Sequence, residues 1–188
     1  MSLILLDRDG VINCHKAGGV RRAEDWQPLP GSVGAMADLS RAGYQLVVVT
    51  NQPGLARGDF QLEDLEAIHA ELRARVEDAG GEVAAIFYCP HGPDDGCRCR
   101  KPATGMLDAV EAEFDTSLHD CYLVGDRVQD LQAAVAKGCR AVLVRTGRGE
   151  ETLEALTRAP EDCLAATMVF DSLAGFSDFL LRTRGASG

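Results

Sequence analysis

The fold is decided by a short stretch near the start of the chain, Leu3-Ile4-Leu5-Leu6-Asp7-Arg8-Asp9-Gly10-Val11-Ile12-Asn13. Its four leading apolar residues are typical of a strand that is buried on both faces, as strands of parallel sheets are. Polar residues follow at once. Positions i and i+2 of an extended backbone face the same side, so Asp7 and Asp9 can point into one site at the carboxyl end of this strand. One carboxylate can attack phosphorus while the other handles protons. Taken alone, the pair is more often two solvated aspartates.

The rest of the chain alternates apolar runs rich in β-formers with helical patterns. We expect strands at 3–6, 44–50, 84–88, 121–124 and 141–145, with a possible edge strand at 168–170. Helices are predicted at 32–42, 62–79, 104–114, 126–137 and 150–158, and a segment at 177–181 closes the fold. This alternation predicts an α/β class, a doubly wound, Rossmann-like parallel sheet covered on both faces. We expect a single domain over 1–182, without a separate cap domain, and a frayed tail over 183–188.

Composition narrows the classes of function. The chain has 188 residues, 46% hydrophobic residues and a net charge of −10. An acidic chain of this kind is a poor partner for nucleic acid, which requires a basic face. The apolar runs are too short to cross a membrane, and the N-terminus lacks the pattern of a signal peptide. We therefore expect a cytoplasmic monomer that binds neither nucleic acid nor membrane.

Two further motifs offer groups that suit a phosphate. Thr50-Asn51-Gln52-Pro53-Gly54-Leu55-Ala56-Arg57-Gly58 follows the second strand, and Thr50 and Asn51 can aim donors at phosphoryl oxygens from a tight Pro-Gly turn. In Arg100-Lys101-Pro102, the proline keeps Lys101 extended, and its ammonium is a point charge for phosphate. Taken alone, the first motif is better explained by an ordinary turn and the second by a surface lysine.

A candidate magnesium ligand follows the fourth strand, in Gly125-Asp126-Arg127-Val128-Gln129-Asp130. Mg²⁺ is usually bound by one or two carboxylates together with substrate phosphate, and Asp126 is placed to supply one of them. The same residue can cap the next helix, with Asp130 one turn on, and the two interpretations are compatible.

A second metal site is predicted from the cysteines. The chain has seven, an odd number that argues against a disulfide framework. Cys89, His91, Cys97 and Cys99 lie close together and form a Cys₃His set that suits structural Zn²⁺. Because all four positions would come from protein, a catalytic zinc is not expected. Chance clustering of cysteines is the alternative.

Together, these motifs resemble the haloacid-dehalogenase superfamily of phosphatases over roughly residues 3–145. The resemblance implies that Asp7 is the nucleophile and Asp9 the proton donor, with Thr50 and Lys101 stabilising the phosphoryl group. It implies Mg²⁺ held by Asp7, the Asp9 carbonyl and Asp126, and substrate recognition by Arg100. Loops 13–31 and 89–101 are then expected to wall the pocket, with Arg57 at its rim.

Within the superfamily, the motifs look most like phosphatases that remove the 7-phosphate of D-glycero-D-manno-heptose 1,7-bisphosphate. Histidinol-phosphate phosphatases are the nearest siblings, and the five-residue gap between His91 and Cys97 looks like theirs. Arg57 and Arg100 would face the second phosphate of a bisphosphate. Two alternatives from other classes are a receiver-type switch domain that accepts phosphate and a zinc-stabilised interaction domain. Neither of these would show multiple turnover.

Overall fold

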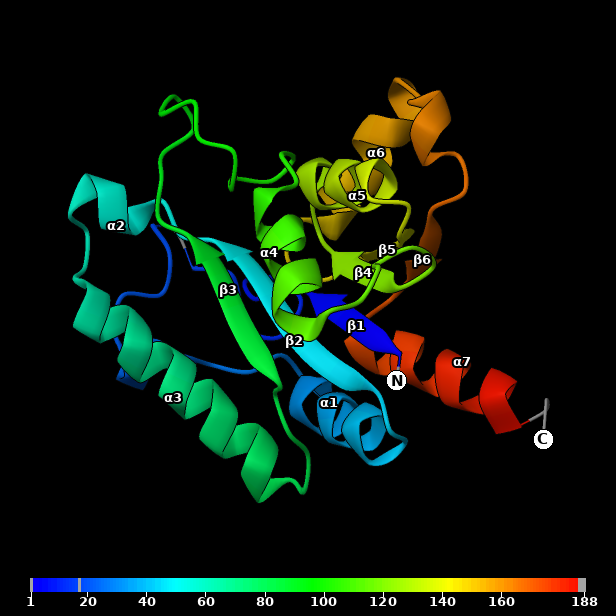
Figure 1. Ribbon diagram of the computed structural model, residues 1–188, viewed down its shortest axis with the longest axis horizontal. Helices are drawn as coiled ribbons and strands as arrows, with labels where there is room; N and C mark the ends of the chain where they lie inside the picture. The colour runs from blue at the N-terminus through cyan, green and yellow to red at the C-terminus, as the bar shows by residue number, and fades with distance from the viewer. Residues whose placement is uncertain (1, 17, 186–188) are drawn as a thin grey trace.

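The computed structural model describes residues 2–16 and 18–185 as a six-stranded parallel sheet with helices on both faces (Figure 1). The strands lie in the order β3-β2-β1-β4-β5-β6. Their bounds are Leu3–Leu6 (β1), Gln45–Asn51 (β2), Ala85–Cys89 (β3), Tyr122–Gly125 (β4), Arg140–Val144 (β5) and Met168–Phe170 (β6). The predicted doubly wound α/β fold is confirmed.

The helices form two layers. They are α1 (Ser32–Arg41), α2 (Gly54–Arg57), α3 (Leu62–Asp78), α4 (Gly105–Phe114), α5 (Val128–Ala136), α6 (Gly149–Arg158) and α7 (Leu173–Gly185), with 3-10 turns at Ala23–Asp25 and Asp162–Leu164. Helices α1, α3 and α7 pack on one face of the sheet, while α4, α5 and α6 cover the other (Figure 1). No helix among the described residues is both long and apolar enough to cross a membrane.

Strand β1 shows why the sequence folds in this way. Its side chains alternate between two hydrophobic cores: Ile4 and Leu6 join the core under α1, α3 and α7, whereas Leu3 and Leu5 join the core under α4 and α5. All four are essentially inaccessible to solvent. A strand with helices on both sides must be apolar at every position, and this one is.

Element boundaries differ slightly from those expected. A short helix, α2, replaces the predicted tight turn after Pro53, and the closing helix α7 begins at Leu173 and extends to Gly185. The expected frayed tail therefore overlaps the helix over 183–185, and its remaining residues, 186–188, lie outside the described part. The differences arise because packing against the sheet sets where a helix ends, and local sequence carries little of that information.

The strand order determines the place of the site. Asp7 directly follows β1, Thr50 and Asn51 end β2, and Asp126 directly follows β4. These three strands are neighbours at the centre of the sheet. Because all the strands are parallel, their carboxyl ends meet at one edge, where ligands of such sheets bind.

Candidate active site

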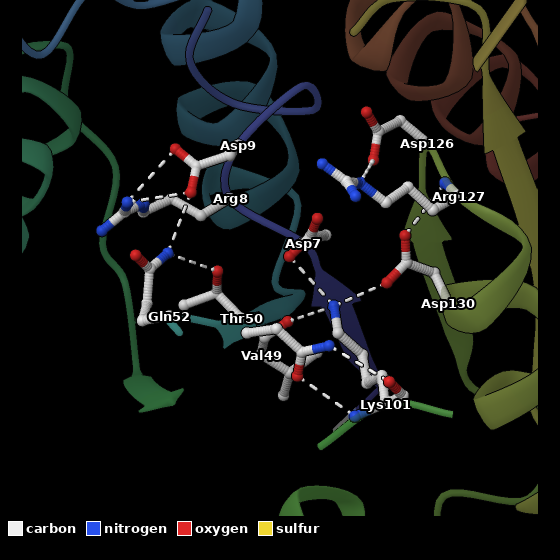
Figure 2. A network of polar contacts seen from close by, with 11 residues as sticks. Asp7, Arg8, Asp9, Val49, Thr50, Gln52, Lys101, Asp126, Arg127 and Asp130 are labelled. Atoms are coloured by element: carbon white, nitrogen blue, oxygen red, sulfur yellow. Dashed lines mark hydrogen bonds and ion pairs between the residues drawn. The ribbon is translucent and has the colours of Figure 1, made fainter. Parts of the chain in front are cut away.

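The centre of the site is the ammonium of Lys101, which is buried (Figure 2). Its Nζ donates to Asp7 Oδ1 at 2.9 Å and to the carbonyl of Val49 at 2.7 Å, and lies 2.6 Å from Asp130 Oδ1. Burial acts to lower the pKa of Lys101, but Asp130 and Asp7 raise it above its usual value. The lysine is therefore a permanent cation, held at a fixed point beside Asp7.

Three carboxylates gather in this part of the site, and two of them, Asp7 and Asp130, contact the Lys101 ammonium. Oxygen atoms of Asp7, Asp126 and Asp130 all lie within 4.8 Å of one another. Burial raises the pKa of Asp7 to about 6, although Lys101 works in the opposite direction. Burial, followed by the charge of Asp7, raises the pKa of Asp126 to about 7. The group thus carries an excess of negative charge that a bound cation would relieve.

Asp126 has one oxygen free for such a cation. Its Oδ2 accepts the backbone N–H of Arg148 at 2.8 Å. Its Oδ1 is buried and has no hydrogen-bond partner among the described residues, although Arg127 Nε lies 4.0 Å away. Oxygen donors of this kind are the ligands that Mg²⁺ prefers. The residues present therefore fit a magnesium ion.

Two glycines let these groups approach closely. Gly10 has a φ of +92°, and a Cβ at this position would lie 2.2 Å from Asp126 Oδ2. A Cβ at Gly125 would lie 2.2 Å from the Cβ of Asp130. Any larger residue would push these carboxylates away from the site. The close approach of the carboxylates therefore requires glycine at both positions.

The Asp9 carboxylate turns away from the three-carboxylate group, toward Arg8 and Gln52 (Figure 2). Its Oδ2 accepts from Arg8 Nη2 and Gln52 Nε2, both at 2.9 Å, and its Oδ1 accepts from Asn13 Nδ2 at 2.8 Å. Burial works to raise the pKa of Asp9, but Arg8 and the amide donors hold it below its usual value. The structure therefore shows Asp9 as a carboxylate whose ionised form is stabilised by hydrogen bonds from Arg8, Gln52 and Asn13.

Residues at the carboxyl end of β2 and directly after it organise this arrangement. Gln52 Nε2 also donates to Thr50 Oγ1 at 2.9 Å, so one amide joins Thr50 to Asp9. Asn51 pairs with the backbone of Lys101 in both directions, since its Nδ2 donates to the Lys101 carbonyl and its Oδ1 accepts the Lys101 N–H, each at 3.1 Å. We expected Asn51 to contact substrate, and in this structure its amide positions Lys101.

A cavity of about 340 Å³ opens over these groups. Asp7, Asp9, Thr50 and Lys101 line it, together with His15 and a set of cationic side chains: Lys16, Arg57, Arg100, Arg127 and Arg148. Arg57 pairs with Asp59 at 2.8 Å, and Arg100 Nη1 donates to the carbonyl of His91 at 3.3 Å. A chain of net charge −10 thus has a locally basic pocket, which suits an anionic substrate.

The four predicted zinc ligands also come together. Cys89 Sγ lies 3.7 Å from Cys97 Sγ, 3.2 Å from Cys99 Sγ and 3.6 Å from His91 Nδ1. His91 Nδ1 lies 3.2 Å from Cys99 Sγ. A tetrahedral zinc with Zn–S bonds of about 2.3 Å has ligand–ligand edges of about 3.8 Å, so the cluster is compact enough to hold one. The cysteines of the described residues are free thiols.

Sequence reasoning missed several residues of the site. Asp130 was noted only for its place one turn along a helix, yet it holds Lys101 and caps α5 by accepting the Arg127 N–H at 3.0 Å. Gln52 lay within a quoted motif but had no assigned role. The wall of Arg127, Arg148 and His15 was also missed. The Asp-x-x-x-Asp spacing at 126–130, on a strand-to-helix turn, was the available signal for Asp130.

The excess of buried negative charge yields a prediction about stability. In protein stripped of divalent cations at about pH 8, Asp126→Asn should raise the free energy of unfolding by about 1 kcal/mol, because it removes one repelling charge and keeps an oxygen for the Arg148 N–H. Added Mg²⁺ should stabilise the wild type and leave the variant nearly unchanged. Urea unfolding measures both, with the exposed Asp178→Asn as a surface control. A less stable variant in metal-free buffer would contradict this account of the site.

Known proteins are similar to this chain in sequence. A family described as "HAD-hyrolase-like" matches residues 98–175. The D-glycero-beta-D-manno-heptose-1,7-bisphosphate 7-phosphatase of Pseudomonas putida is 50% identical over 181 residues, covering 96% of this chain and 100% of the relative. The enzyme of the same name from Pseudomonas aeruginosa is 48% identical, covering 96% and 98%.

A solved structure agrees with these relatives. The crystal structure of D,D-heptose 1.7-bisphosphate phosphatase from B. bronchiseptica, complexed with magnesium and phosphate, matches with a TM-score of 0.91 and 44% identity. The match covers 97% of this chain and 99% of that one. The chain therefore belongs to the heptose-1,7-bisphosphate 7-phosphatase family of the haloacid-dehalogenase superfamily and is a phosphoric monoester hydrolase.

Proposed function

We propose that this chain removes the 7-phosphate of D-glycero-D-manno-heptose 1,7-bisphosphate through an aspartyl-phosphate formed on Asp7. The observation that carries the proposal is the Asp7 carboxylate, held 2.9 Å from a buried lysine in the lining of a cavity rich in cationic side chains. A carboxylate placed beside a fixed cation can approach an anionic phosphoryl group that it would otherwise repel. The names of the relatives support the substrate.

The first step is an in-line attack by an Asp7 oxygen on phosphorus. The new bond joins Asp7 to phosphorus, and the bond from phosphorus to the sugar oxygen breaks. Lys101 and the Thr50 hydroxyl stabilise charge on the equatorial oxygens. Asp9 protonates the departing sugar oxygen, which requires that Asp9 has taken up a proton beforehand.

The second step returns the enzyme to its starting state. Asp9, now ionised, takes a proton from a water molecule, and that water attacks the phosphorus of the aspartyl-phosphate. The bond between Asp7 and phosphorus breaks, and inorganic phosphate leaves. The contacts that Asp9 makes with Arg8, Gln52 and Asn13 favour its ionised form, which is the form that this second step requires.

We propose that Mg²⁺ is held by Asp7, Asp126 and the carbonyl of Asp9. When bound, it supplies positive charge next to the phosphoryl group. Asp126 Oδ1, which accepts no hydrogen bond from the described residues, and the crowding of three carboxylates support this set. Asp130 is engaged with Lys101 and the α5 N-terminus, so its part is to position the lysine.

Zinc is proposed to have a structural role. Cys89, His91, Cys97 and Cys99 close the loop that carries Arg100 and Lys101 into the site. The segment between the ligands contains few apolar residues, so a metal would supply the order that a core cannot. The monomeric state and the cytoplasmic location stay predictions.

The remote phosphate of the bisphosphate is proposed to meet Arg57 and Arg100. Both line the cavity, and Arg100 is anchored to the zinc loop through the His91 carbonyl. An arginine fork gives charge-assisted, often bidentate hydrogen bonds to phosphate. In an acidic chain, local cations of this kind are required for a doubly phosphorylated substrate to bind.

Substrate and nucleophile are tested together. With Mg²⁺, the wild type should turn over heptose 1,7-bisphosphate repeatedly and with a higher kcat/KM than histidinol phosphate. Asp7→Asn should abolish turnover and keep the fold, because an amide oxygen cannot form the acyl phosphate. Steady-state phosphate release and circular dichroism measure these outcomes. A preference for histidinol phosphate would favour the sibling family, and a single turnover would favour a receiver-type switch.

Zinc is tested by elemental analysis. Protein prepared without chelators should contain one zinc per chain, and Cys97→Ser should lose most of it along with thermal stability and activity. Cys163→Ser removes an exposed thiol outside the cluster and is the matched control. Wild type without zinc, or a Cys97→Ser variant that retains it, would contradict the site.

Recognition of the remote phosphate is tested by the ratio of kcat/KM for the bisphosphate to kcat/KM for a sugar monophosphate. Arg100→Ala should lower kcat/KM for heptose 1,7-bisphosphate by about 10-fold to 100-fold while affecting a sugar monophosphate much less. Arg57→Ala should act in the same direction. Arg98→Ala, which removes an exposed arginine outside the cavity, should leave the ratio unchanged. Equal losses on both substrates in the two cavity variants would reject this role.

A further inference from the structure

Arg8 is an arginine with no exposure to solvent, located between the two aspartates of the first motif. Its Nη2 donates to both oxygens of Asp9, at 3.1 and 2.9 Å. Its Nη1 lies 3.3 Å from Nε2 of His69. Its Nε is buried without a hydrogen-bond partner among the described residues. The guanidinium is thus fixed by two contacts, Asp9 at one end and His69 at the other.

The direction of the contact with His69 follows from its chemistry. An arginine has donors and no acceptor, so His69 Nε2 must accept and cannot carry a proton. Burial and the neighbouring charge of Arg8 lower the pKa of His69 to about 3, which agrees with a neutral ring. His69 is therefore a permanent acceptor that faces a permanent donor.

The location of His69 is unusual for a histidine. It lies on the buried face of α3, where the other buried residues are aliphatic: Leu65, Ile68, Leu72 and Val76. Tyr88 on β3 is its aromatic neighbour, with ring centroids 5.9 Å apart. An aliphatic residue would fill this space, but it would leave an N–H of the charged Arg8 buried and unpaired, which is unfavourable. The guanidinium would then have reason to shift.

We infer that His69 is a positioning residue for the phosphatase reaction, acting through Arg8 to fix the orientation of the Asp9 carboxylate. This inference rests on the proposed function, in which Asp9 exchanges protons with the leaving group and water. Arg8 contacts both Asp9 oxygens through one nitrogen, so a movement of the guanidinium would carry the carboxylate with it. Helix α3 is in this way linked to the chemistry at the end of β1.

The test compares two substrates whose leaving groups differ in basicity. Protonation matters for an alkyl phosphate, whose departing oxygen is strongly basic, and matters little for 4-nitrophenyl phosphate, whose departing phenolate is stable. His69→Phe should therefore lower kcat/KM for heptose 1,7-bisphosphate by about 10-fold or more and change kcat/KM for 4-nitrophenyl phosphate by less than about threefold. Asp9→Asn should show the same selectivity with a larger loss. His69→Gln, which retains an acceptor, should restore most of the activity.

Two further variants separate positioning from packing. Tyr88→Leu disturbs the packing around His69 but keeps His69 Nε2 as the acceptor for Arg8. Its kcat/KM values for the two substrates should therefore change by equal factors. If His69→Phe does not fold, His69→Asn replaces it, since its shorter side chain cannot reach Arg8, and the same selective loss is expected. If the folded His69 variant loses kcat/KM equally on both substrates, or loses none, the role of His69 is overturned while the proposed function still stands. A wild type inactive on both phosphates would overturn the proposed function and this role with it.

Discussion

The site depends on one interaction, the buried ammonium of Lys101 held between Asp7 and Asp130. Asp126 lies beside these two carboxylates, so three acidic groups share one buried lysine, and the cluster carries an excess of negative charge when all three are ionised. Buried charge of this kind is unfavourable unless it is paired. The protein fixes Lys101 from several sides, through the Val49 carbonyl and the Asn51 amide. The negative charge that remains unbalanced is the charge that a bound divalent cation would neutralise.

The parallel sheet is what allows this arrangement. Three adjacent central strands end at the same edge, so Asp7, Thr50 and Asp126 meet although they are far apart in the sequence. The loop that carries the cluster of three cysteines and His91 brings Lys101 to the same place from beyond β3. An acidic chain thereby presents a basic cavity, because cations from several loops face one another across a small volume. Net charge is consequently a poor guide to the charge of a pocket.

The sequence was sufficient for the fold class, the clustering of the main polar motifs and the zinc set, since these follow from strand alternation and from short spacings. It was not sufficient for Asp130, Gln52 or His69. Their roles arise from contacts across large separations, such as the 61 positions between Arg8 and His69, and from burial that no local pattern reveals. Arg8 illustrates the difficulty: in the sequence it is one charged residue between two aspartates, and in the fold it is fully buried. The short helix α2 and the length of α7 were missed for the same reason.

The central claim is that Asp7 carries the phosphoryl group during turnover. An acyl phosphate is reduced by borohydride to an alcohol, which converts the aspartate that bears it into homoserine. Protein quenched with borohydride while it hydrolyses heptose 1,7-bisphosphate, and then analysed by peptide mass spectrometry, should contain homoserine at position 7. Asp9, Asp126 and Asp130 should remain aspartate. Homoserine at one of these three positions, or none at position 7 in protein shown to be turning over, would contradict the account.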